Sequence, residues 1–496
     1  MKSRVVFLLL SLYFIVLVPV FAESPDREDS LPIYLTDEEL QRLDEIGIRH
    51  RSTSAPVGEI RNSAEWEPSV GVIIRWPLGI PISLIAEMSE DLIVTTIVGT
   101  QQQQSNAQSS YTSGGVNMSN TEFIIAPTDS YWTRDYGPWF IFVDNEMAIV
   151  DQVYNRPRPN DDVIPQAIGT EWGLTVYGMD LIHTGGNHMS EGLGMSMSTR
   201  LVYDENDDDL TASEVDAMML AYLGNDYTVL EYIESGGIHH IDCWAKFLNP
   251  TTILVKDVPP GHPSYDLLNA RALFLSQQTS AWDQPYTVLR IFCPSGTAYT
   301  NSIILRDKVF VPLFNSSYDS VALQVYEDAM PGYEILGFLG SWLDDDAIHC
   351  RTMGVPDAGM LFIDHVPLTD DDVSAGDYPI LTTIKACSGQ PLLSDSLRVH
   401  YSVNGGSWQY VTMQSTKLQD EYIGYIPSQV GGSEISYYVE AADESGRVET
   451  HPYIGAPWAH KFIAPPQVPT LDEWGIFLTL ALLTVAIIKK RKSAQS

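Results

Sequence analysis

The sequence predicts a protein in two parts, an α/β domain followed by a β-sandwich. From about residue 64 to about residue 365, apolar runs typical of strands, such as VGVIIRWP, DLIVTTIV and NSIILRDKVFVPLF, alternate with segments of helical periodicity. From about residue 369 to 465 the helical pattern disappears, and apolar and polar residues alternate between turns rich in glycine. The second pattern is typical of an immunoglobulin-like sandwich, in which Asn404 and Gly405 would form a hairpin turn.

Residues 1–22 have the pattern of a signal peptide. Lys2 and Arg4 precede an apolar run, and the small residue Ala22 supplies a cleavage site. We therefore expect an exported protein whose mature chain begins near Glu23. The alternative is an uncleaved anchor helix.

Residues 23–60 form an N-terminal segment that is too short to be a domain. Leu40, Leu43 and Ile46 recur at helical spacing after Thr36, which is a good N-terminal cap. This pattern predicts a short amphipathic helix.

Residues 466–496 carry a second targeting pattern. VPTLDEWG leads into 13 apolar residues, Ile476–Ile488, and then into the basic run 489–492. An unstrained membrane helix needs about 20 apolar residues, so this run is short for a permanent anchor. The pattern resembles the C-terminal sorting tails of Gram-negative bacteria, with Val468 in place of the usual isoleucine. We interpret it as a processing signal with at most a transient inner-membrane anchor, and a plain tail anchor is the alternative.

The charge of the chain limits its partners. With 28 basic and 64 acidic residues, the formal net charge is −36. No basic surface is available to neutralise phosphates, so we expect no nucleic acid as partner. A cationic small molecule or a cationic peptide suits this field better.

Only four cysteines occur, namely Cys243, Cys293, Cys350 and Cys387, so no disulfide framework is expected. Cys387 falls in the predicted sandwich and is interpreted as a small buried hydrophobic residue. Cys350 follows His349 directly, and it could be a structural thiol, half of a disulfide or a nucleophile.

The stretch YWTRDYGPWF at 131–140 crowds aromatic residues around one carboxylate. Trp132 offers a face for stacking and Asp135 offers a negative charge, which together suit a planar cation. The alternative is a turn in which Arg134 and Asp135 are packed by aromatic rings.

In GGIHHIDCWAKF, at 236–247, His240 and Asp242 lie two residues apart. In a strand they would project to the same face and could act together as base and carboxylate. The alternative is an ordinary surface hydrogen bond.

The remaining polar stretches suggest a carboxylate site and no metal. His183 and His188 lack a recognisable ligand spacing, and we expect neither a metal nor an organic cofactor. An acidic run at 207–209 is interpreted as a solvated loop and not a calcium site. In YNRPRPND, Arg156 and Arg158 alternate in an extended stretch and could form a fork for a carboxylate, or they could simply face solvent.

Taken together, these motifs resemble the guanidine-modifying pentein superfamily, and within it the group of agmatine deiminases and bacterial peptidylarginine deiminases. The shared marks are Trp-x-Arg-Asp-x-Gly-Pro at 132–138, Gly-Gly-Asn at 185–187, His-Ile-Asp at 240–242, an asparagine after an aromatic residue at 299–301, and His-Cys at 349–350. The resemblance implies a five-bladed ββαβ propeller over residues 61–367, with the sandwich at 368–465.

The resemblance also implies roles for individual residues. Cys350 would be the nucleophile, His240 the general acid and base, and Asp135 and Asp242 the carboxylates that hold the guanidinium. The residues that would bind the rest of the substrate are Trp132, Arg156, Arg158 and Asn301. Cys350 should then stay out of any disulfide.

The expected function is that of an exported protein-arginine deiminase that releases ammonia from peptidyl arginine, preferably at a C-terminus. In the resembling peptide enzyme, an arginine pair receives the α-carboxylate of the substrate. Gly237 stands where that enzyme would have a tyrosine, so the pocket is expected to differ in shape. Agmatine deiminase and a non-catalytic surface adhesin are the alternatives. Expected partners are arginine-containing peptides and the envelope sorting machinery.

Overall fold

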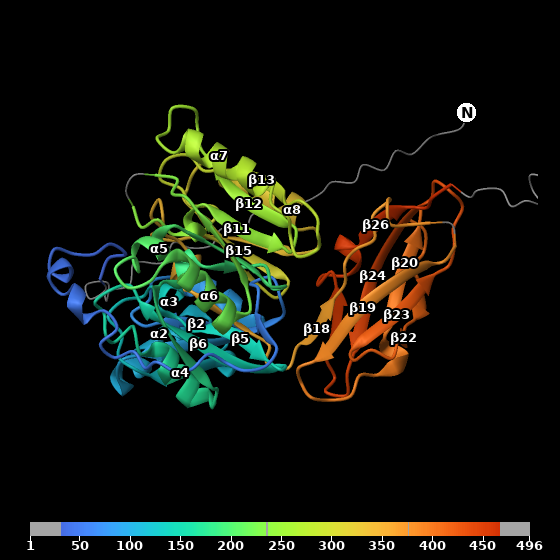
Figure 1. Cartoon of the computed structure of the whole chain (residues 1–496). Coiled ribbons are helices and arrows are strands. Elements are labelled where there is room, and N and C mark those ends of the chain that lie inside the picture. Colours follow the sequence, from blue (N-terminus) through green and yellow to red (C-terminus); the bar gives the residue numbers. More distant parts are fainter. Residues whose placement is uncertain (1–30, 235–236, 375, 467–496) are drawn as a thin grey trace, which may run out of the picture.

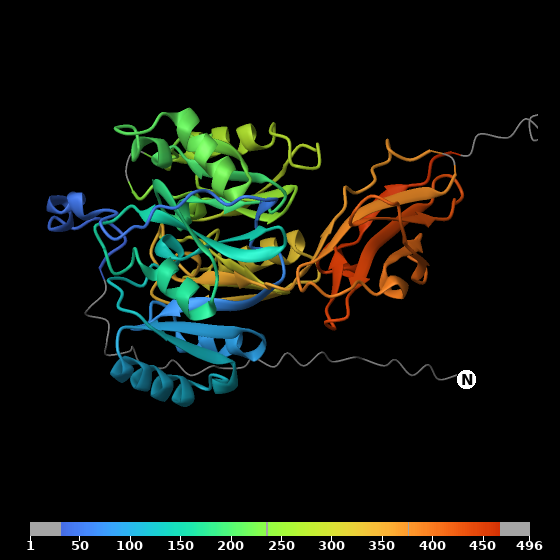
Figure 2. The ribbon, with the colours of Figure 1, turned by 60° about the horizontal axis from the view of Figure 1, so that its bottom comes forward.

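The computed structural model describes residues 31–234, 237–374 and 376–466 (Figures 1 and 2). The predicted signal peptide and all but the first residue of the predicted sorting tail lie outside these ranges. Among the residues described, none of the helices combines the length and the apolar composition that crossing a membrane requires.

In the described part of the chain up to Pro356, the strands form five sheets. Four of them are β1-β5-β6-β7, β10-β9-β8, β11-β12-β13 and β14-β15-β16, and the fifth is β17-β2-β3-β4. Their strands are β1 (Ile60–Asn62), β2 (Ser69–Arg75), β3 (Ile93–Val98), β4 (Thr121–Ile125), β5 (Trp139–Val143), β6 (Glu146–Tyr154), β7 (Val176–His183), β8 (Met189–Ser190), β9 (Met195–Thr199), β10 (Asp226–Leu230), β11 (Ala245–Asn249), β12 (Thr252–Asp257), β13 (Thr287–Phe292), β14 (Ile303–Leu305), β15 (Lys308–Leu313), β16 (Glu334–Leu339) and β17 (Met353–Pro356).

Each sheet combines an antiparallel pair with a parallel pair that is joined through a helix. For example, β5 and β6 are antiparallel, whereas β6 and β7 are parallel. A parallel pair needs a crossover connection, which accounts for the alternation of strand and helix patterns in the sequence. The crossover helices are α1 (Ile82–Asp91), α2 (Gln101–Gly114), α4 (Ile164–Trp172), α6 (Ala212–Leu223), α7 (Tyr265–Leu275) and α8 (Asp319–Ala329), and the one-turn helices are α3 (Thr133–Tyr136) and α5 (Leu201–Asp204).

The first and last parts of this α/β region share one sheet. Strand β17 pairs antiparallel with β2, so that Met353 lies opposite Ile73. The segment that follows Cys350 is thereby fixed to the beginning of the domain.

The strands beyond residue 360 form two further sheets around their own hydrophobic core. Their order is β18-β19-β23-β22 and β21-β20-β24-β25, with β26 also paired to β24. The strands are β18 (Leu361–Asp364), β19 (Tyr378–Ala386), β20 (Arg398–Val403), β21 (Gln409–Thr412), β22 (Gln414–Ser415), β23 (Glu421–Ile426), β24 (Glu434–Ala442), β25 (Val448–His451) and β26 (His460–Ile463). Asn404 and Gly405 both have positive φ, 51° and 68°, and turn the chain between β20 and β21 as expected.

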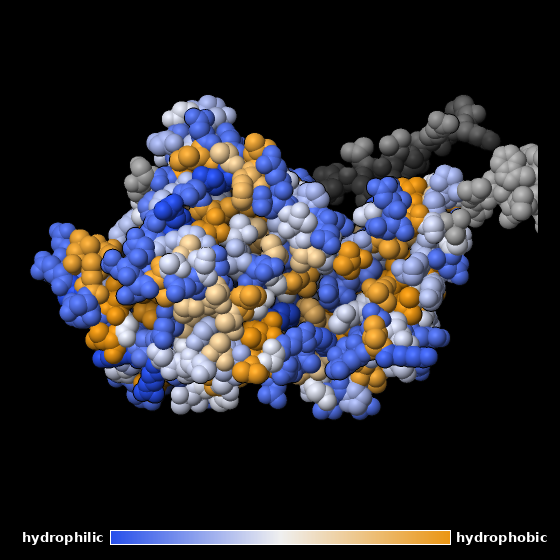
Figure 3. Space-filling view, in the orientation of Figure 1, coloured by the Kyte–Doolittle hydropathy of each residue, from blue (hydrophilic) through white to orange (hydrophobic). Residues whose placement is uncertain are grey.

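The two parts touch along one side (Figure 1). Arg447 of the second part binds Asp357 with two hydrogen bonds of 2.7 and 2.8 Å. Arg61 of the first part places its guanidinium carbon 4.1 Å from the ring centre of Phe362. On the face seen in Figure 3, hydrophobic and hydrophilic residues are interspersed over both parts.

The N-terminal segment differs from its prediction. Instead of one amphipathic helix it forms two 3₁₀ turns, Glu39–Gln41 and Leu43–Glu45, and Leu40 is 52% exposed. Within these two turns the buried residue is Glu39. Its carboxylate binds Arg158, and this long-range pairing takes precedence over an apolar helical face.

Candidate active site

The first part of the site is Asp135 on the one-turn helix α3. Its side chain is almost fully buried, and Oδ1 lies 3.5 Å from Nδ1 of His240. Gln152 donates a hydrogen bond of 3.2 Å to the main-chain oxygen of Asp135, which fixes the turn. The tryptophan motif therefore builds a short rigid turn that directs one carboxylate inward.

His240 and Asp242 do not lie on a strand, contrary to the prediction. His240 caps a 3₁₀ turn, Ile241–Cys243, that carries Asp242. The backbone N–H of Ile241 donates to the side-chain oxygen of Asn187, at 3.2 Å, so this turn is tied to the Gly-Gly-Asn motif. A bond from a side chain of another motif thus replaces the strand pairing that the alternation suggested.

The Gly-Gly-Asn motif leaves space at the point where three functional groups converge. A Cβ atom on Gly186 would lie 2.6 Å from Oδ1 of Asp135, 2.7 Å from Nδ1 of His240 and 3.3 Å from Oδ2 of Asp242. These distances show that two carboxylates and one imidazole surround a single point. Glycine is needed there because any side chain would displace them.

Cys350 lies beside this point on a 3₁₀ turn, His349–Arg351. Its Sγ atom is 3.4 Å from Oδ2 of Asp242 and accepts a hydrogen bond of 3.2 Å from Nδ2 of Asn301. All four cysteines are free, so Cys350 is not in a disulfide. The four predicted catalytic residues are therefore brought together.

Asn301 contacts the nucleophile segment, residues 346–351, through both the nitrogen and the oxygen of its side-chain amide. Its Oδ1 accepts from the backbone N–H groups of Ala347 and Cys350, at 2.9 and 3.2 Å. Asn301 thus holds the Cys350 turn, and its predicted contact with substrate stays a prediction. Arg351 adds to this rigidity because its guanidinium forms a buried ion pair with Asp346.

Burial dominates the electrostatics of the site. Desolvation, reinforced by the charge of Asp242, raises the pKa of the Cys350 thiol well above its ordinary value. Desolvation and the Asp242 charge also raise the pKa of Asp135 to about 7, and burial lowers the pKa of His240 to about 3. By itself the site therefore favours a thiol and a neutral imidazole.

A cation placed among these groups would reverse the first two shifts. It would stabilise the thiolate of Cys350 and the carboxylate of Asp135, because both become negative on losing a proton. The site is thus suited to a ligand that brings its own positive charge.

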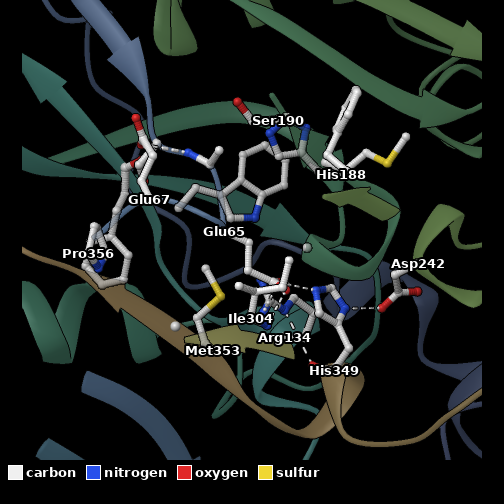
Figure 4. A pocket seen from close by; sticks show the side chains of 18 of the residues that line it. Glu65, Glu67, Arg134, His188, Ser190, Asp242, Ile304, His349, Met353 and Pro356 are labelled. Atoms are coloured by element: carbon white, nitrogen blue, oxygen red, sulfur yellow. Dashed lines mark hydrogen bonds and ion pairs between the residues drawn. The ribbon is translucent and has the colours of Figure 1, made fainter. Parts of the chain in front are cut away.

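Sequence analysis missed a second layer of charged groups behind Asp242. His349 bridges Asp242 and Glu65, with distances of 2.7 Å on each side, and Glu65 also binds Lys246 at 2.6 Å (Figure 4). These groups border a small cavity of about 100 Å³. Glu65 stands in no recognised motif, and the one available signal was the position of His349 next to Cys350.

The predicted arginine fork is only partly formed. Arg158 is fully buried and binds Glu39 through Nε, at 2.7 Å, and the carbonyl oxygen of Pro32 through Nη2, at 2.6 Å. Its Nη1 atom is buried without a hydrogen-bond partner among the described residues. Arg156 is also buried, and its Nη1 donates to the main-chain oxygen of Asn155 at 3.1 Å. The alternative of solvent-facing arginines is wrong, because both side chains are buried and the N-terminal segment binds Arg158. The fork for a carboxylate stays a prediction.

Trp132 has a structural environment that the prediction did not include. Its ring is buried, its Nε1 donates to the main-chain oxygen of Leu31 at 3.0 Å, and the guanidinium carbon of Arg351 lies 5.4 Å from its ring. A cation of the protein itself thus already contacts this ring. Stacking of a substrate on Trp132 stays a prediction.

The two histidines that suggested a metal have other contacts. His183 is 3.1 Å from the hydroxyl of Tyr227, and His188 stacks on Trp139 with ring centres 4.5 Å apart. Within the described ranges, no group of three or more His, Cys, Asp or Glu side chains is arranged to hold a metal ion.

Residues 61–356 match the family model described as Porphyromonas-type peptidyl-arginine deiminase. A relative from Legionella pneumophila with the name "Putative agmatine deiminase" is 25% identical over 267 residues, which cover 48% of this chain and 75% of the relative.

Solved structures resemble the α/β part in fold. The agmatine deiminase of Enterococcus faecalis has a TM-score of 0.53 at 20% identity, and the match covers 61% of this chain and 99% of that one. A protein from Porphyromonas gingivalis described as a "Putative Arginine Deiminase" has a TM-score of 0.54 at 19% identity, with 60% and 99% covered. The α/β part therefore has the fold of pentein-type deiminases.

Proposed function

Because the chain belongs to the Porphyromonas-type peptidyl-arginine deiminase family, we propose that it converts the arginine of peptides or proteins to citrulline and ammonia. Membership of the family implies a hydrolase that acts on C–N bonds. The observation that carries the proposal is the convergence of Asp135, His240 and Asp242 on Gly186, with the Cys350 thiol 3.4 Å from Asp242.

The reaction begins with binding of the guanidinium cation between Asp135 and Asp242. A guanidinium stays protonated at neutral pH and fits carboxylates in a bidentate manner. Its charge makes ionisation of Cys350 easier, and neutral His240 accepts the thiol proton. The sulfur then forms a bond to the guanidinium carbon and gives a tetrahedral adduct.

His240 next returns the proton to one nitrogen of the adduct. The C–N bond breaks, ammonia leaves, and a thiouronium remains on Cys350. Water then attacks the same carbon while His240 takes one of its protons. When the C–S bond breaks, the ureido group of citrulline is released, and the hydroxyl proton of the adduct passes to the departing sulfur. Ammonia finally carries away the proton held by His240, as ammonium.

The preference for peptidyl arginine rests on the positive groups near Asp135. Arg156 and Nη1 of Arg158 could receive a carboxylate, which agmatine does not have. The agmatine deiminase alternative is favoured by the names of the relatives and by the binding of Arg158 to Glu39. A non-catalytic adhesin is disfavoured, because such a protein would not require these four side chains to converge.

One experiment separates these functions. Release of ammonia and of the ureido product is measured for agmatine, free arginine, a peptide with internal arginine and a peptide with C-terminal arginine. A higher kcat/KM for either peptide supports the proposal. A much higher value for agmatine supports the alternative, and no release from any substrate supports the adhesin.

We further propose the architecture and location that accompany this function. The five sheets of the α/β part would be propeller blades, closed where β17 pairs with β2, and the second part would be an immunoglobulin-like domain. The N-terminal and C-terminal sequence patterns would direct export to the cell surface or medium. Immunoblotting of fractionated host cells tests the location.

A further inference from the structure

The residue next to the candidate nucleophile connects two carboxylates. Nδ1 of His349 lies 2.7 Å from Oδ2 of Asp242, and Nε2 lies 2.7 Å from Oε2 of Glu65 (Figure 4). The histidine side chain is 7% exposed and that of Asp242 is 5% exposed. Both contacts are therefore shielded from solvent.

Two carboxylates face the ring nitrogens of His349. Burial alone would raise the pKa of Asp242 and of Glu65, but hydrogen bonds and positive neighbours outweigh burial and hold both pKa values below the ordinary range. An ionised carboxylate can only accept hydrogen bonds. Each carboxylate is therefore an acceptor for the ring nitrogen of His349 that faces it.

Glu65 is a fixed anchor for His349. Its oxygens receive Nζ of Lys246 at 2.6 Å, Nη2 of Arg134 at 3.1 Å and the backbone N–H of Ile304 at 2.8 Å. With so many donors on one carboxylate, Glu65 cannot move without breaking several bonds. His349 is consequently held in place from the side opposite to Asp242.

Asp135 and Asp242, the two carboxylates at the substrate position, have different neighbours. Asp135 has His240 at 3.5 Å as its neighbour, whereas Asp242 has His349 at 2.7 Å. Two like charges at one buried point do not both ionise easily. His349 thus selects Asp242 as the carboxylate that stays charged and stays aimed at the ligand.

We propose that His349 is a positioning residue that ties Asp242 to Glu65 and keeps the Asp242 carboxylate ionised and oriented toward the guanidinium of the substrate. The proposal rests on the proposed function, since it assigns Asp242 to the guanidinium.

The charged and titratable groups around Asp242 come from several elements. From the turn at 240–243 they are His240 and Cys243, from helix α3 Arg134 and Asp135, from strand β11 Lys246, and from the nucleophile segment Asp346, His349 and Cys350. In direct contact with the Asp242 carboxylate are His349 and the two thiols. Because a thiol is a weak hydrogen-bond donor, His349 is the contact whose loss should change the titration of Asp242 most.

Two substitutions of His349 separate its two bonds. The amide nitrogen of His349→Asn can replace Nδ1 and keep the bond to Asp242, while losing Glu65. The amide nitrogen of His349→Gln can reach the position of Nε2 and keep Glu65, while losing Asp242. Each variant therefore removes one hydrogen bond of His349, His349→Asn the bond to Glu65 and His349→Gln the bond to Asp242.

A matched control is His365→Gln. His365 is also a buried histidine with both ring nitrogens bonded, at 2.8 Å to the main-chain oxygen of Leu381 and at 2.8 Å to the hydroxyl of Tyr437. It lies in the second part of the structure, away from the candidate active site. Its replacement measures what the loss of a buried histidine does to stability alone.

We expect His349→Gln to lower kcat/KM about 10- to 100-fold and His349→Asn to lower it less than about tenfold. The acid limb of the kcat/KM profile should move to higher pH in His349→Gln, because Asp135 and Asp242 share one buried site and the loss of the His349 bond makes the last proton harder to remove from the pair. His365→Gln should lower the Tm without moving this limb. Equal losses in both His349 variants, with an acid limb at the wild-type position, would overturn the proposal.

A second measurement does not require turnover. Cys350 is alkylated with chloroacetamidine, a cation that resembles a guanidinium, and with neutral chloroacetamide. The ratio of the two rates should fall in His349→Gln and change little in His349→Asn. If the wild type hydrolyses no arginine substrate but the ratio falls as expected, the function fails and the positioning role stands. A ratio equal to that of the wild type in both variants would disprove that role.

Discussion

Glu39 and Arg158 form a buried ion pair between the N-terminal segment and the α/β part, with 2.7 Å between Oε1 and Nε. The two residues are 119 positions apart in the sequence. Burial alone would raise the pKa of Glu39, but the hydrogen bond from Arg158 lowers it, so the carboxylate stays charged. The N-terminal segment thus supplies a counter-charge beside the proposed substrate site.

Breaking this pair should cost stability. Glu39→Gln leaves the buried guanidinium of Arg158 without its counter-charge, and removal of one partner from a buried pair typically costs about 3–5 kcal/mol. Urea unfolding of Glu39→Gln and of the double variant Glu39→Gln, Arg158→Met tests this. The double variant should recover part of the loss. A single variant as stable as wild type would show that the pair contributes nothing.

Replacement of the nucleophile should abolish turnover while leaving the fold intact. Cys350→Ser should retain the wild-type Tm to within a few degrees and release no ammonia. At neutral pH a serine hydroxyl is a far weaker nucleophile than a cysteine thiol. Cys293→Ala and Cys387→Ala are the matched controls, and each should keep activity within about tenfold. A fully active Cys350→Ala protein would exclude the thiouronium route.

Cys243 is a more demanding control than Cys293 or Cys387. Its Sγ lies 3.1 Å from the main-chain oxygen of Asp345 and 3.7 Å from Oδ1 of Asp242. We still expect Cys243→Ala to remain within about tenfold of wild-type activity, since a thiol is a weak hydrogen-bond donor in both contacts. A larger loss in the ammonia assay would show that Cys243 helps to orient Asp242.

The pH dependence should follow Asp135. Its pKa is raised to about 7 by burial and by the charge of Asp242, and it must be ionised to bind a guanidinium. Since kcat/KM reports the free enzyme, kcat/KM should rise with pH through about 7. His240 is neutral above about 3 and does not limit this rise. A flat profile between pH 5.5 and 8 would contradict the assignment.

The same shift predicts a stability effect of opposite direction. The pKa of Asp135 in the folded state is above its unfolded value of about 3.9, so its contribution to stability is fully present below about pH 4 and is lost as pH rises through about 7. Asp135→Asn cannot titrate. The variant should match wild type near pH 4 and be more stable by roughly 2–4 kcal/mol at pH 8, as measured by urea unfolding.

The sequence could predict the participants of the site better than their geometry. Asp135, His240, Asp242 and Cys350 stand in short motifs, and local spacing made them visible. The strand expected at 240–242 is a 3₁₀ turn instead, because a side chain from another motif, Asn187, bonds its first residue. Such a long-range bond leaves no periodic signal in the local sequence.

Partners far apart in the sequence were the part that could not be predicted. Glu65 reaches His349 across 284 positions. The apolar residues near Glu39 formed a helical pattern, yet Leu40 is exposed and Glu39 is buried, because the arginine that attracts it belongs to a distant motif. Periodicity reports the average environment of a face and not the destination of one charged side chain.

Substrate selectivity should depend on Arg156. This arginine is buried and its charge acts on Asp135, and Nη1 has its bond to the adjacent main-chain oxygen of Asn155, so its charge is available to a carboxylate. Losing a contact to an ionised group costs roughly 1.5–3 kcal/mol, so Arg156→Ala should lower kcat/KM for C-terminal arginine about 10- to 100-fold. Activity on internal arginine and on agmatine should be nearly unchanged.

Arg158→Ala is less informative alone, because it also breaks the ion pair with Glu39. The substitution is therefore compared in a protein that already carries Glu39→Gln and has been stabilised by changes elsewhere. In that protein the effect of Arg158 on substrate can be separated from its effect on folding. If Nη1 of Arg158 also receives the carboxylate, the loss should again be confined to C-terminal arginine. A loss of equal size on agmatine, in variants with wild-type Tm, would mean that these arginines act through Asp135 and not through the carboxylate of the substrate.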